Sequence, residues 1–342
     1  MGRGGLPRRG FLVGSLALTG CGGWGAGTAW AVEATTVIDC DQWGARPTSR
    51  VVTVVPRRPV KILVHHTATP NVPDPGRAAA ELLARAIQTF HIDRRGWLDS
   101  GQHFTISRGG YVLEGRHRSL EALRSGGKHV EGAHCTGQNR VAVGIENEGT
   151  YLDVEPPGAL WDSLRALCAY TCEQYGVAPT EIFGHRDFKD TACPGDRLYH
   201  MLPRLRSEVG GLLGKQVATA EVLKASWPLL RVGDRGAAVL AAQYLLRDAG
   251  MTEVVPDGRY SQRMADLAYS FQTARGSDEV TGMIGGESWP VLARPVHRGE
   301  GSDAERAVQA LAAGSGVQRL PEVVTPPVWQ RLLGTAGMPH QR

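Results

Sequence analysis

The sequence predicts an α/β fold for its first half, with a mixed central sheet flanked by helices. The main observation is that short apolar runs of strand length alternate with longer segments whose apolar residues recur at helical spacing. Apolar residues make up 42% and charged residues 21% of the 342 residues, which excludes a wholly disordered chain. The length favours two folded units over one.

Local patterns predict the individual elements of this half. An apolar run leads into two adjacent histidines, which is typical of a buried strand that ends in polar residues. A turn of Arg108, Gly109 and Gly110 between two short strands predicts a hairpin. Pro156 and Pro157 favour the start of a helix. In chain order we expect a strand at 61–64, a helix at 78–90, strands at 102–106, 111–114 and 141–146, and a helix after 157.

The first 31 residues predict an export signal. Arg8 and Arg9 form a twin-arginine pair before a short apolar stretch, and small residues lead to an A-x-A cleavage site at 29–31. The alternative is a lipoprotein box at 18–21, in which Cys21 would be lipidated. We favour simple secretion, and no stretch of the sequence approaches the ~20 apolar residues that span a bilayer.

The net charge gives no argument for binding nucleic acid. The formal charge of +4 includes three arginines of the export signal, which contains no acidic residue. Without that segment 35 basic side chains face 34 acidic ones, so the chain is almost neutral.

The second half contains an internal repeat and few histidines. Nine of the eleven histidines lie between His65 and His200, which places the expected chemistry in the first half. A polar, small-residue stretch before 227 predicts the domain boundary. Beyond it, Gly233 and Gly299 each precede a glutamine by ten residues, and each copy ends near a tryptophan, the second copy being shorter. We expect both tryptophans, Trp289 and Trp329, to lie in a core.

His185 and Cys193 form a candidate metal pair eight residues apart. Imidazole and thiolate are preferred ligands of zinc, and a catalytic zinc has three protein ligands and one open position. His65 is the best third candidate because it lies where a buried strand ends. Spacing alone leaves open a surface histidine and a disulfide cysteine.

Five motifs occur in one order along the first half: VHHTA at 64–68, GWLDSGQHF at 96–104, GAH at 132–134, VGIE at 143–146, and GHRD through CPGD at 184–196. Together they resemble the zinc-dependent N-acetylmuramoyl-L-alanine amidases, which include phage lysozyme amidases and peptidoglycan recognition proteins. The second half resembles a peptidoglycan-binding domain, a small all-α module. The resemblance implies an amidase domain at 38–212, a linker at 213–226, a peptidoglycan-binding domain at 227–293 and a truncated second repeat at 294–335, after the signal at 1–31.

Position by position, the resemblance makes His65, His185 and Cys193 the ligands of a Zn²⁺ cofactor. The general base differs between branches of the family. Some relatives carry a catalytic tyrosine at the position of Gln102, and glutamine cannot titrate. Another branch has a glutamate in the Gly-Ile-Glu strand, so we expect Glu146 to be the general base and later the acid.

The resemblance also implies supporting roles. Thr191 is expected near the oxyanion, with Lys189 as the alternative, although Lys189 is better interpreted as a solvated loop lysine. Asp187 is expected to orient a ligand histidine through its other ring nitrogen, and His66 to lie behind the ligands. The residues expected to contact substrate are His134, Asn139 and Gln102.

The six cysteines allow at most two disulfides. Cys21 goes with the signal or takes lipid and Cys193 goes to zinc. Cys168 and Cys172 lie one helical turn apart, about 5 to 6 Å between Cβ atoms, which is too far for a disulfide. Cys40 and Cys135 would then each pair with a helix cysteine. The family's habit of tying the N-terminal segment to this helix favours Cys40 with Cys168.

The resemblance therefore implies a secreted, monomeric zinc hydrolase at the cell wall, which cleaves the amide bond between N-acetylmuramic acid and L-alanine in peptidoglycan. The alternative is a non-catalytic peptidoglycan recognition protein. The presence of Cys193 speaks against it, because non-catalytic relatives commonly lose that cysteine. A wall-binding structural protein is a third, weaker interpretation.

Overall fold

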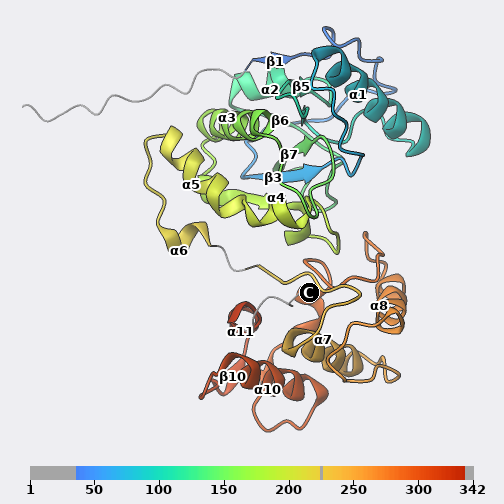
Figure 1. Ribbon diagram of the computed structural model, residues 1–342, viewed down its shortest axis with the longest axis vertical. Helices are drawn as coiled ribbons and strands as arrows, with labels where there is room; N and C mark the ends of the chain where they lie inside the picture. Colours follow the sequence, from blue (N-terminus) through green and yellow to red (C-terminus); the bar gives the residue numbers. More distant parts are fainter. Residues whose placement is uncertain (1–35, 224–225, 336–342) are drawn as a thin grey trace, which may run out of the picture.

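The computed structural model describes residues 36–223 and 226–335, which form two units (Figure 1). We call residues 36–212 the N-terminal unit and residues 227–335 the C-terminal unit. The segment between them contains the short helix α6 (Thr219–Val222). The predicted export signal and Cys21 lie outside the described residues. Within the described ranges, no helix combines the length and apolar character needed to cross a membrane.

The N-terminal unit is built on a six-stranded mixed sheet, which confirms the predicted fold class. The strand order is β1-β5-β4-β7-β3-β8, and all neighbours are parallel except β4 and β5, the predicted hairpin. A separate antiparallel pair joins β2 to β6. The strands are β1 (Val37–Ile38), β2 (Val54–Val55), β3 (Lys61–His66), β4 (Phe104–Ile106), β5 (Val112–Glu114), β6 (His129–Val130), β7 (Ala142–Asn147) and β8 (Ile182–Gly184).

Helices alternate with these strands as the sequence predicts. Helix α1 continues into a π-helical turn. His185, the first of the two later metal-ligand candidates, begins a short 3-10 turn. The helices are α1 (Arg77–Thr89), η1 (Phe90–Arg94), α2 (Ser119–Ser125), α3 (Gly158–Tyr175), η2 (Pro179–Glu181), η3 (His185–Asp187), α4 (Asp196–His200) and α5 (Leu202–Leu212).

The two faces of the sheet carry different side chains. Ile62 and Val64 of β3 belong to the main core, together with Leu164 of α3 and Leu205 of α5. Because side chains alternate along a strand, His65 points to the opposite face. His65 therefore lies on the face of the sheet opposite the main core, and that face also carries Leu63 of a smaller buried cluster.

The C-terminal unit has one hydrophobic core that both copies of the repeat share. Trp289 and Trp329 are fully buried in this core, which confirms the prediction for both. Ser261 and Ser302 cap the helices α8 and α10 by accepting main-chain N–H groups. The elements are α7 (Ala237–Asp248), α8 (Gln262–Arg275), α9 (Trp289–Leu292), β9 (Val296–His297), α10 (Asp303–Ser315), β10 (Val323–Val324) and α11 (Pro326–Thr335).

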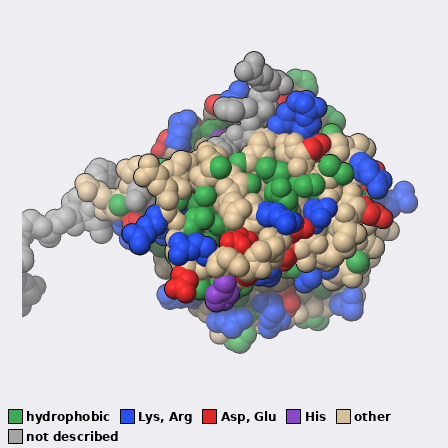
Figure 2. All heavy atoms as spheres, turned by 90° about the horizontal axis from the view of Figure 1, so that it is seen from below, with side chains coloured by type: hydrophobic (Ala, Val, Ile, Leu, Met, Phe, Trp, Pro, Cys, Tyr) green, Lys and Arg blue, Asp and Glu red, His purple; other side chains and the backbone are tan. Residues whose placement is uncertain are grey.

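The lower face of this unit shows no surface of a single charge. In Figure 2, which views the molecule from below, basic and acidic side chains surround a group of hydrophobic ones.

The predicted disulfide between Cys40 and Cys168 is wrong. All five cysteines within the described residues are free. Cys40 lies in a small cluster with Trp43 and its thiol contacts the carbonyl oxygen of Gly115, whereas Cys168 belongs to the main core. These thiols are packed as small apolar groups, and burial raises the pKa of Cys172 to about 12.

Candidate metal centre

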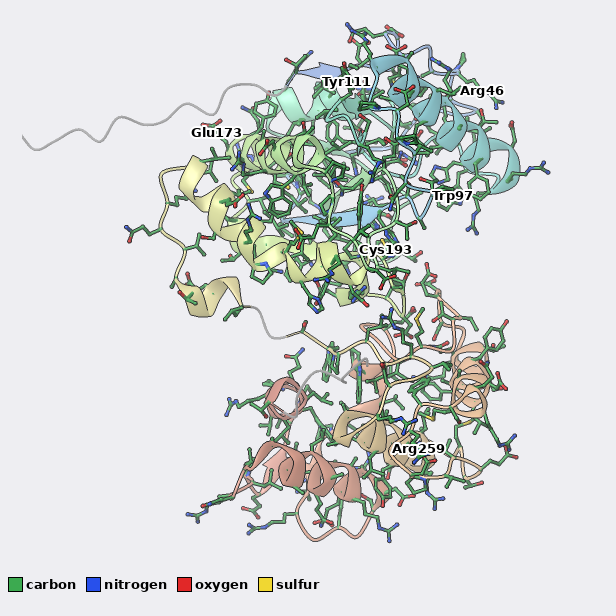
Figure 3. All side chains as sticks on the ribbon, in the orientation of Figure 1. Arg46, Trp97, Tyr111, Glu173, Cys193 and Arg259 are labelled. Atoms are coloured by element: carbon green, nitrogen blue, oxygen red, sulfur yellow. The ribbon has the colours of Figure 1, made fainter. Side chains whose placement is uncertain are left out.

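Three side chains converge at the edge of the N-terminal unit that faces the C-terminal unit. His65 lies near the end of β3, His185 begins η3, and Cys193 follows in the next loop (Figure 3). Their ligand atoms all lie within 4.8 Å of one another. The structure thus brings together the three residues that the sequence predicts as ligands.

The donor set and its spacing fit zinc. Tetrahedral zinc, with bonds of about 2.0 to 2.1 Å to nitrogen and about 2.3 Å to sulfur, holds a nitrogen and a sulfur ligand about 3.5 Å apart. Nδ1 of His65 lies 3.7 Å from Sγ of Cys193. Two imidazoles and one thiol also leave a fourth position free for another ligand, which is the catalytic arrangement.

Burial keeps both ligand histidines neutral, which is the form that binds metal. Burial, reinforced by neighbouring histidines, holds the pKa of His65 well below its usual value. The same effect lowers the pKa of His185 to about 3. Burial also raises the pKa of the Cys193 thiol, so a bound cation is what would favour its thiolate.

His134 determines which nitrogen of His65 faces Cys193. Nε2 of His65 lies 3.0 Å from Nδ1 of His134, and Nε2 of His134 lies 3.4 Å from the carbonyl oxygen of Ala142. A carbonyl oxygen only accepts, so His134 donates from Nε2 and its Nδ1 accepts the proton of His65. The lone pair of His65 Nδ1 is thereby directed toward Cys193.

The position of His134 is fixed by its surroundings. Oδ1 of Asn139 accepts the main-chain N–H groups of His134 and Cys135, at 2.9 and 3.0 Å. The imidazole lies over Gly144 of β7, where a Cβ atom would come within 2.5 Å of the ring. This support of a ligand histidine was missed from the sequence. The one available signal was a glycine inside a strand, which often marks a close approach of another group.

Glu146 lies beside His65 on the same face of the sheet. The two residues are register partners in the parallel pair of β3 and β7, and Thr105 of β4 is the partner of Glu146 on its other side. Oε2 of Glu146 is buried and has no hydrogen-bond partner within the described residues. Burial raises the pKa of this carboxyl to about 8. Glu146 also lines a cavity of about 340 Å³ beneath α1, together with Thr67, Ile87 and His91.

Two predicted residues support Cys193. His66 donates its main-chain N–H to Sγ of Cys193 at 3.4 Å, while its Nδ1 accepts the N–H of Tyr151. Oγ1 of Thr191 accepts the N–H of Cys193 at 3.3 Å. The expected role of Thr191 at the oxyanion stays a prediction.

Gln102 contacts Thr105, the register partner of Glu146, but it is buried. It is 2% exposed, and its Nε2 donates to Oγ1 of Thr105 at 2.9 Å. Substrate contact by Gln102, like that by His134 and Asn139, stays a prediction.

The expectation that Asp187 contacts a ligand imidazole is wrong. Its carboxylate accepts the N–H of Gly184 at 2.8 Å and the hydroxyl of Tyr199 at 2.5 Å. Asp187 therefore holds the main chain on either side of His185 and acts on the turn instead of on the ring.

Comparisons with known proteins match the N-terminal unit. Residues 56–196 match the family model described as N-acetylmuramoyl-L-alanine amidase. The chain is 31% identical over 190 residues to peptidoglycan recognition protein 1 of Bos taurus, covering 55% of this chain and 89% of that protein. It is 34% identical over 166 residues to the N-acetylmuramoyl-L-alanine amidase of Homo sapiens, covering 47% of this chain and 27% of that protein.

A solved structure of wild-type Drosophila PGRP-LB is similar over 49% of this chain and 92% of its own, with 29% identity and a TM-score of 0.43. The matches in sequence, which span nearly the whole length of the bovine protein, show that this chain belongs to the family of N-acetylmuramoyl-L-alanine amidases and peptidoglycan recognition proteins.

Proposed function

We propose that this protein is a secreted zinc hydrolase that cleaves the amide bond between N-acetylmuramic acid and L-alanine in peptidoglycan. The observation that carries the proposal is the register of His65 with Glu146, which puts a candidate ligand beside a carboxyl oxygen that has no hydrogen-bond partner within the described residues. His65, His185 and Cys193 would hold the zinc ion. When bound there, zinc supplies Lewis acidity toward water and an amide carbonyl.

Glu146 performs the proton transfers in this proposal. It accepts a proton from the water that attacks the lactyl carbonyl carbon, and it donates that proton to the alanine nitrogen as the C–N bond breaks. The products are a lactyl carboxylate and a free L-alanine amino terminus. Burial raises the pKa of Glu146 to about 8 and a nearby cation favours its charged form, so the group can gain and lose a proton near neutral pH.

Thr191 is proposed to donate its hydroxyl to the developing oxyanion. Its oxygen already accepts the N–H of Cys193, which leaves the hydroxyl proton available for substrate. The cavity beneath α1 opens beside Glu146 and is the proposed site for the part of the muropeptide next to the scissile bond. His134, Asn139 and Gln102 are proposed to contact the same ligand.

Export and wall binding complete the proposal. The twin-arginine signal at 1–31 would direct the chain out of the cell, with lipidation at Cys21 as the alternative. The C-terminal unit would hold the enzyme on peptidoglycan and so raise its local concentration there. The similarity to a bovine peptidoglycan recognition protein and to a human N-acetylmuramoyl-L-alanine amidase supports peptidoglycan as the substrate.

Digestion of purified sacculi tests the reaction. The wild type is expected to release L-alanine amino termini without new reducing ends, as identified by mass spectrometry. Glu146→Gln is expected to keep its zinc while kcat falls by about 10² to 10⁴. Cys193→Ser is expected to lose zinc and activity together. Glu173→Gln is the matched control because this exposed glutamate of α3 lies far from Cys193 (Figure 3).

Two results would contradict the proposal. Undiminished activity of Glu146→Gln would exclude Glu146 as the base. A preparation without zinc that gains no activity when zinc is added would favour the non-catalytic recognition protein.

A further inference from the structure

The segment that joins His185 to Cys193 packs against the C-terminal unit. We call residues 185–193 the ligand loop. Two of its charged side chains, Lys189 and Asp190, are only 5% and 0% exposed. Charged side chains on a loop are seldom buried to this degree unless they are paired, so their partners indicate what the loop is built to contact.

Lys189 forms ion pairs that join the two units. Its ammonium contacts the carboxylates of Asp278 and Glu287, both in the C-terminal unit. The expectation of a solvated loop lysine is therefore wrong, since these two partners replace the water that the lysine loses.

Asp190 binds the C-terminal unit still more closely. Its carboxylate accepts five hydrogen bonds of 2.6 to 3.3 Å, and every donor belongs to that unit. Removing a buried acceptor of this kind strands its donors, which makes the contact costly to break. The donors are the main-chain N–H groups of Gly285, Glu287 and Ser288, the hydroxyl of Ser288 and the amide of Gln272.

The main chains of the two units also touch. A Cβ atom on Gly286 would lie 2.4 Å from the carbonyl carbon of Asp187 and 2.5 Å from the carbonyl oxygen of Arg186. The interface therefore has no room for a single methyl group at this point.

A fourth contact lies three residues after the ligand loop. Asp196 pairs with Arg186 of the loop at 2.7 Å and with Arg231 of the C-terminal unit. The C-terminal unit thus contacts the chain within and just after the stretch that supplies two of the three proposed metal ligands.

We propose that the C-terminal unit is a structural part of the metal centre, because its docking through Asp190 and Gly286 holds the ligand loop in the shape that brings His185 and Cys193 to His65. Zinc affinity then depends on a contact made almost one hundred residues downstream of the loop. The inference rests on the proposed function only in taking zinc as the metal. Asp190 is a positioning residue, since it acts on the loop main chain.

Gly286→Ala in the full-length chain tests this dependence from the C-terminal side. The added methyl group clashes with the main chain of Arg186 and Asp187 across the interface, and no residue of the N-terminal unit is substituted. Gly334→Ala is the matched control, because a Cβ atom there meets nothing within 4 Å in α11. The two measurements are the zinc dissociation constant, from competition with a chelator, and hydrogen exchange of residues 184–196 in the metal-free protein.

Gly286→Ala is expected to weaken zinc binding by about 10- to 100-fold, the range seen when the support of a ligand is lost. Exchange of residues 184–196 should become faster in the metal-free protein and slow again when zinc is saturating. A general loss of structure would instead speed exchange across the N-terminal unit, including β3 and β7. Asp190→Ala tests the same contact from the loop side and keeps the proposal falsifiable where the glycine variant does not fold.

Wild-type zinc affinity and wild-type loop exchange in folded Gly286→Ala would overturn the inference, and so would an equal effect of Gly334→Ala. A wild type that neither binds zinc nor cleaves sacculi would instead refute the proposed function. In that case exchange of residues 184–196 in the metal-free variants still decides whether docking holds the loop.

Discussion

Nδ1 of His134 lies 3.0 Å from Nε2 of His65, and this contact orients the predicted metal ligand. A third histidine, His103, packs against His134, and their ring centroids lie 5.4 Å apart. Nδ1 of His103 accepts the N–H of Gly144, so its Nε2 donates to the carbonyl oxygen of Val130. Main-chain groups thus fix the tautomer of each of these two rings behind the candidate metal centre.

His134→Ala is expected to weaken zinc binding by about 10- to 100-fold, because His65 loses the acceptor that holds its ring. His134→Gln should lose less, since its carboxamide oxygen can still accept from His65. Competition with a chelator measures both affinities. Equal affinity of His134→Ala and the wild type would show that His65 needs no such support.

Gly144→Ala is expected to lower zinc affinity without removing any polar group. The new Cβ atom would lie 2.5 to 2.7 Å from three ring atoms of His134 and would displace that ring. Overpacking of this kind also destabilises a fold by about 1 to 3 kcal/mol. Gly158→Ala at the start of α3 is the control, since a Cβ atom there meets nothing within 4 Å. Gly144→Ala should show a lower free energy of unfolding in urea and a lower zinc affinity than Gly158→Ala. Identical values for the two variants would contradict the close packing of His134 on Gly144.

The pair of His117 and Asp99 should make stability depend on pH. Nδ1 of His117 lies 2.9 Å from Oδ2 of the buried Asp99, and this contact raises the pKa of His117. A raised pKa stabilises the fold fully below the unfolded value of about 6.5, and the gain is lost as pH rises through the folded value. The free energy of unfolding of the wild type should therefore exceed that of His117→Gln by a smaller margin as the pH rises above about 6.5. Urea unfolding across this range measures it, and a difference independent of pH would refute the ion pair.

Trp329→Ala is expected to destabilise the whole C-terminal unit. The side chain is fully buried in the core that both repeat copies share, and such truncations cost about 3 to 5 kcal/mol. Because α10 and α7 contribute to the same core, α7 should lose protection from hydrogen exchange along with α10 and α11. Loss of protection confined to residues 296–335 would show that the copies fold independently.

The sequence was sufficient to predict the mixed sheet and the cluster of His65, His185 and Cys193. The sheet followed from local apolar patterns, and the cluster followed from ordered motifs placed where strands end. The sheet rests on patterns close by in the chain, whereas the cluster joins residues 128 positions apart and was predicted only through the resemblance to a known family.

Contacts that depend on distant packing were not predicted. Nothing in the spacing of His134 distinguishes a substrate contact from support of His65, because the distinction depends on how its loop crosses β7. Lys189 was interpreted as solvated because its partners lie some ninety residues further on. The disulfide between Cys40 and Cys168 failed because the two thiols belong to separate clusters. The repeat was recognised, but its single core is a property of tertiary packing.

Because the ligand loop docks on the C-terminal unit, the parts of the site form in a fixed order during synthesis. His65 and Glu146 can reach their final spacing as soon as β3 and β7 pair, because neighbouring strands lie about 4.8 Å apart whatever loops surround them. The hydrogen bonds from residues 285–288 to Asp190 can form only after those residues exist. A growing chain can therefore pair His65 with Glu146 early, whereas the loop that carries His185 and Cys193 is docked only after residues 285–288 have been made.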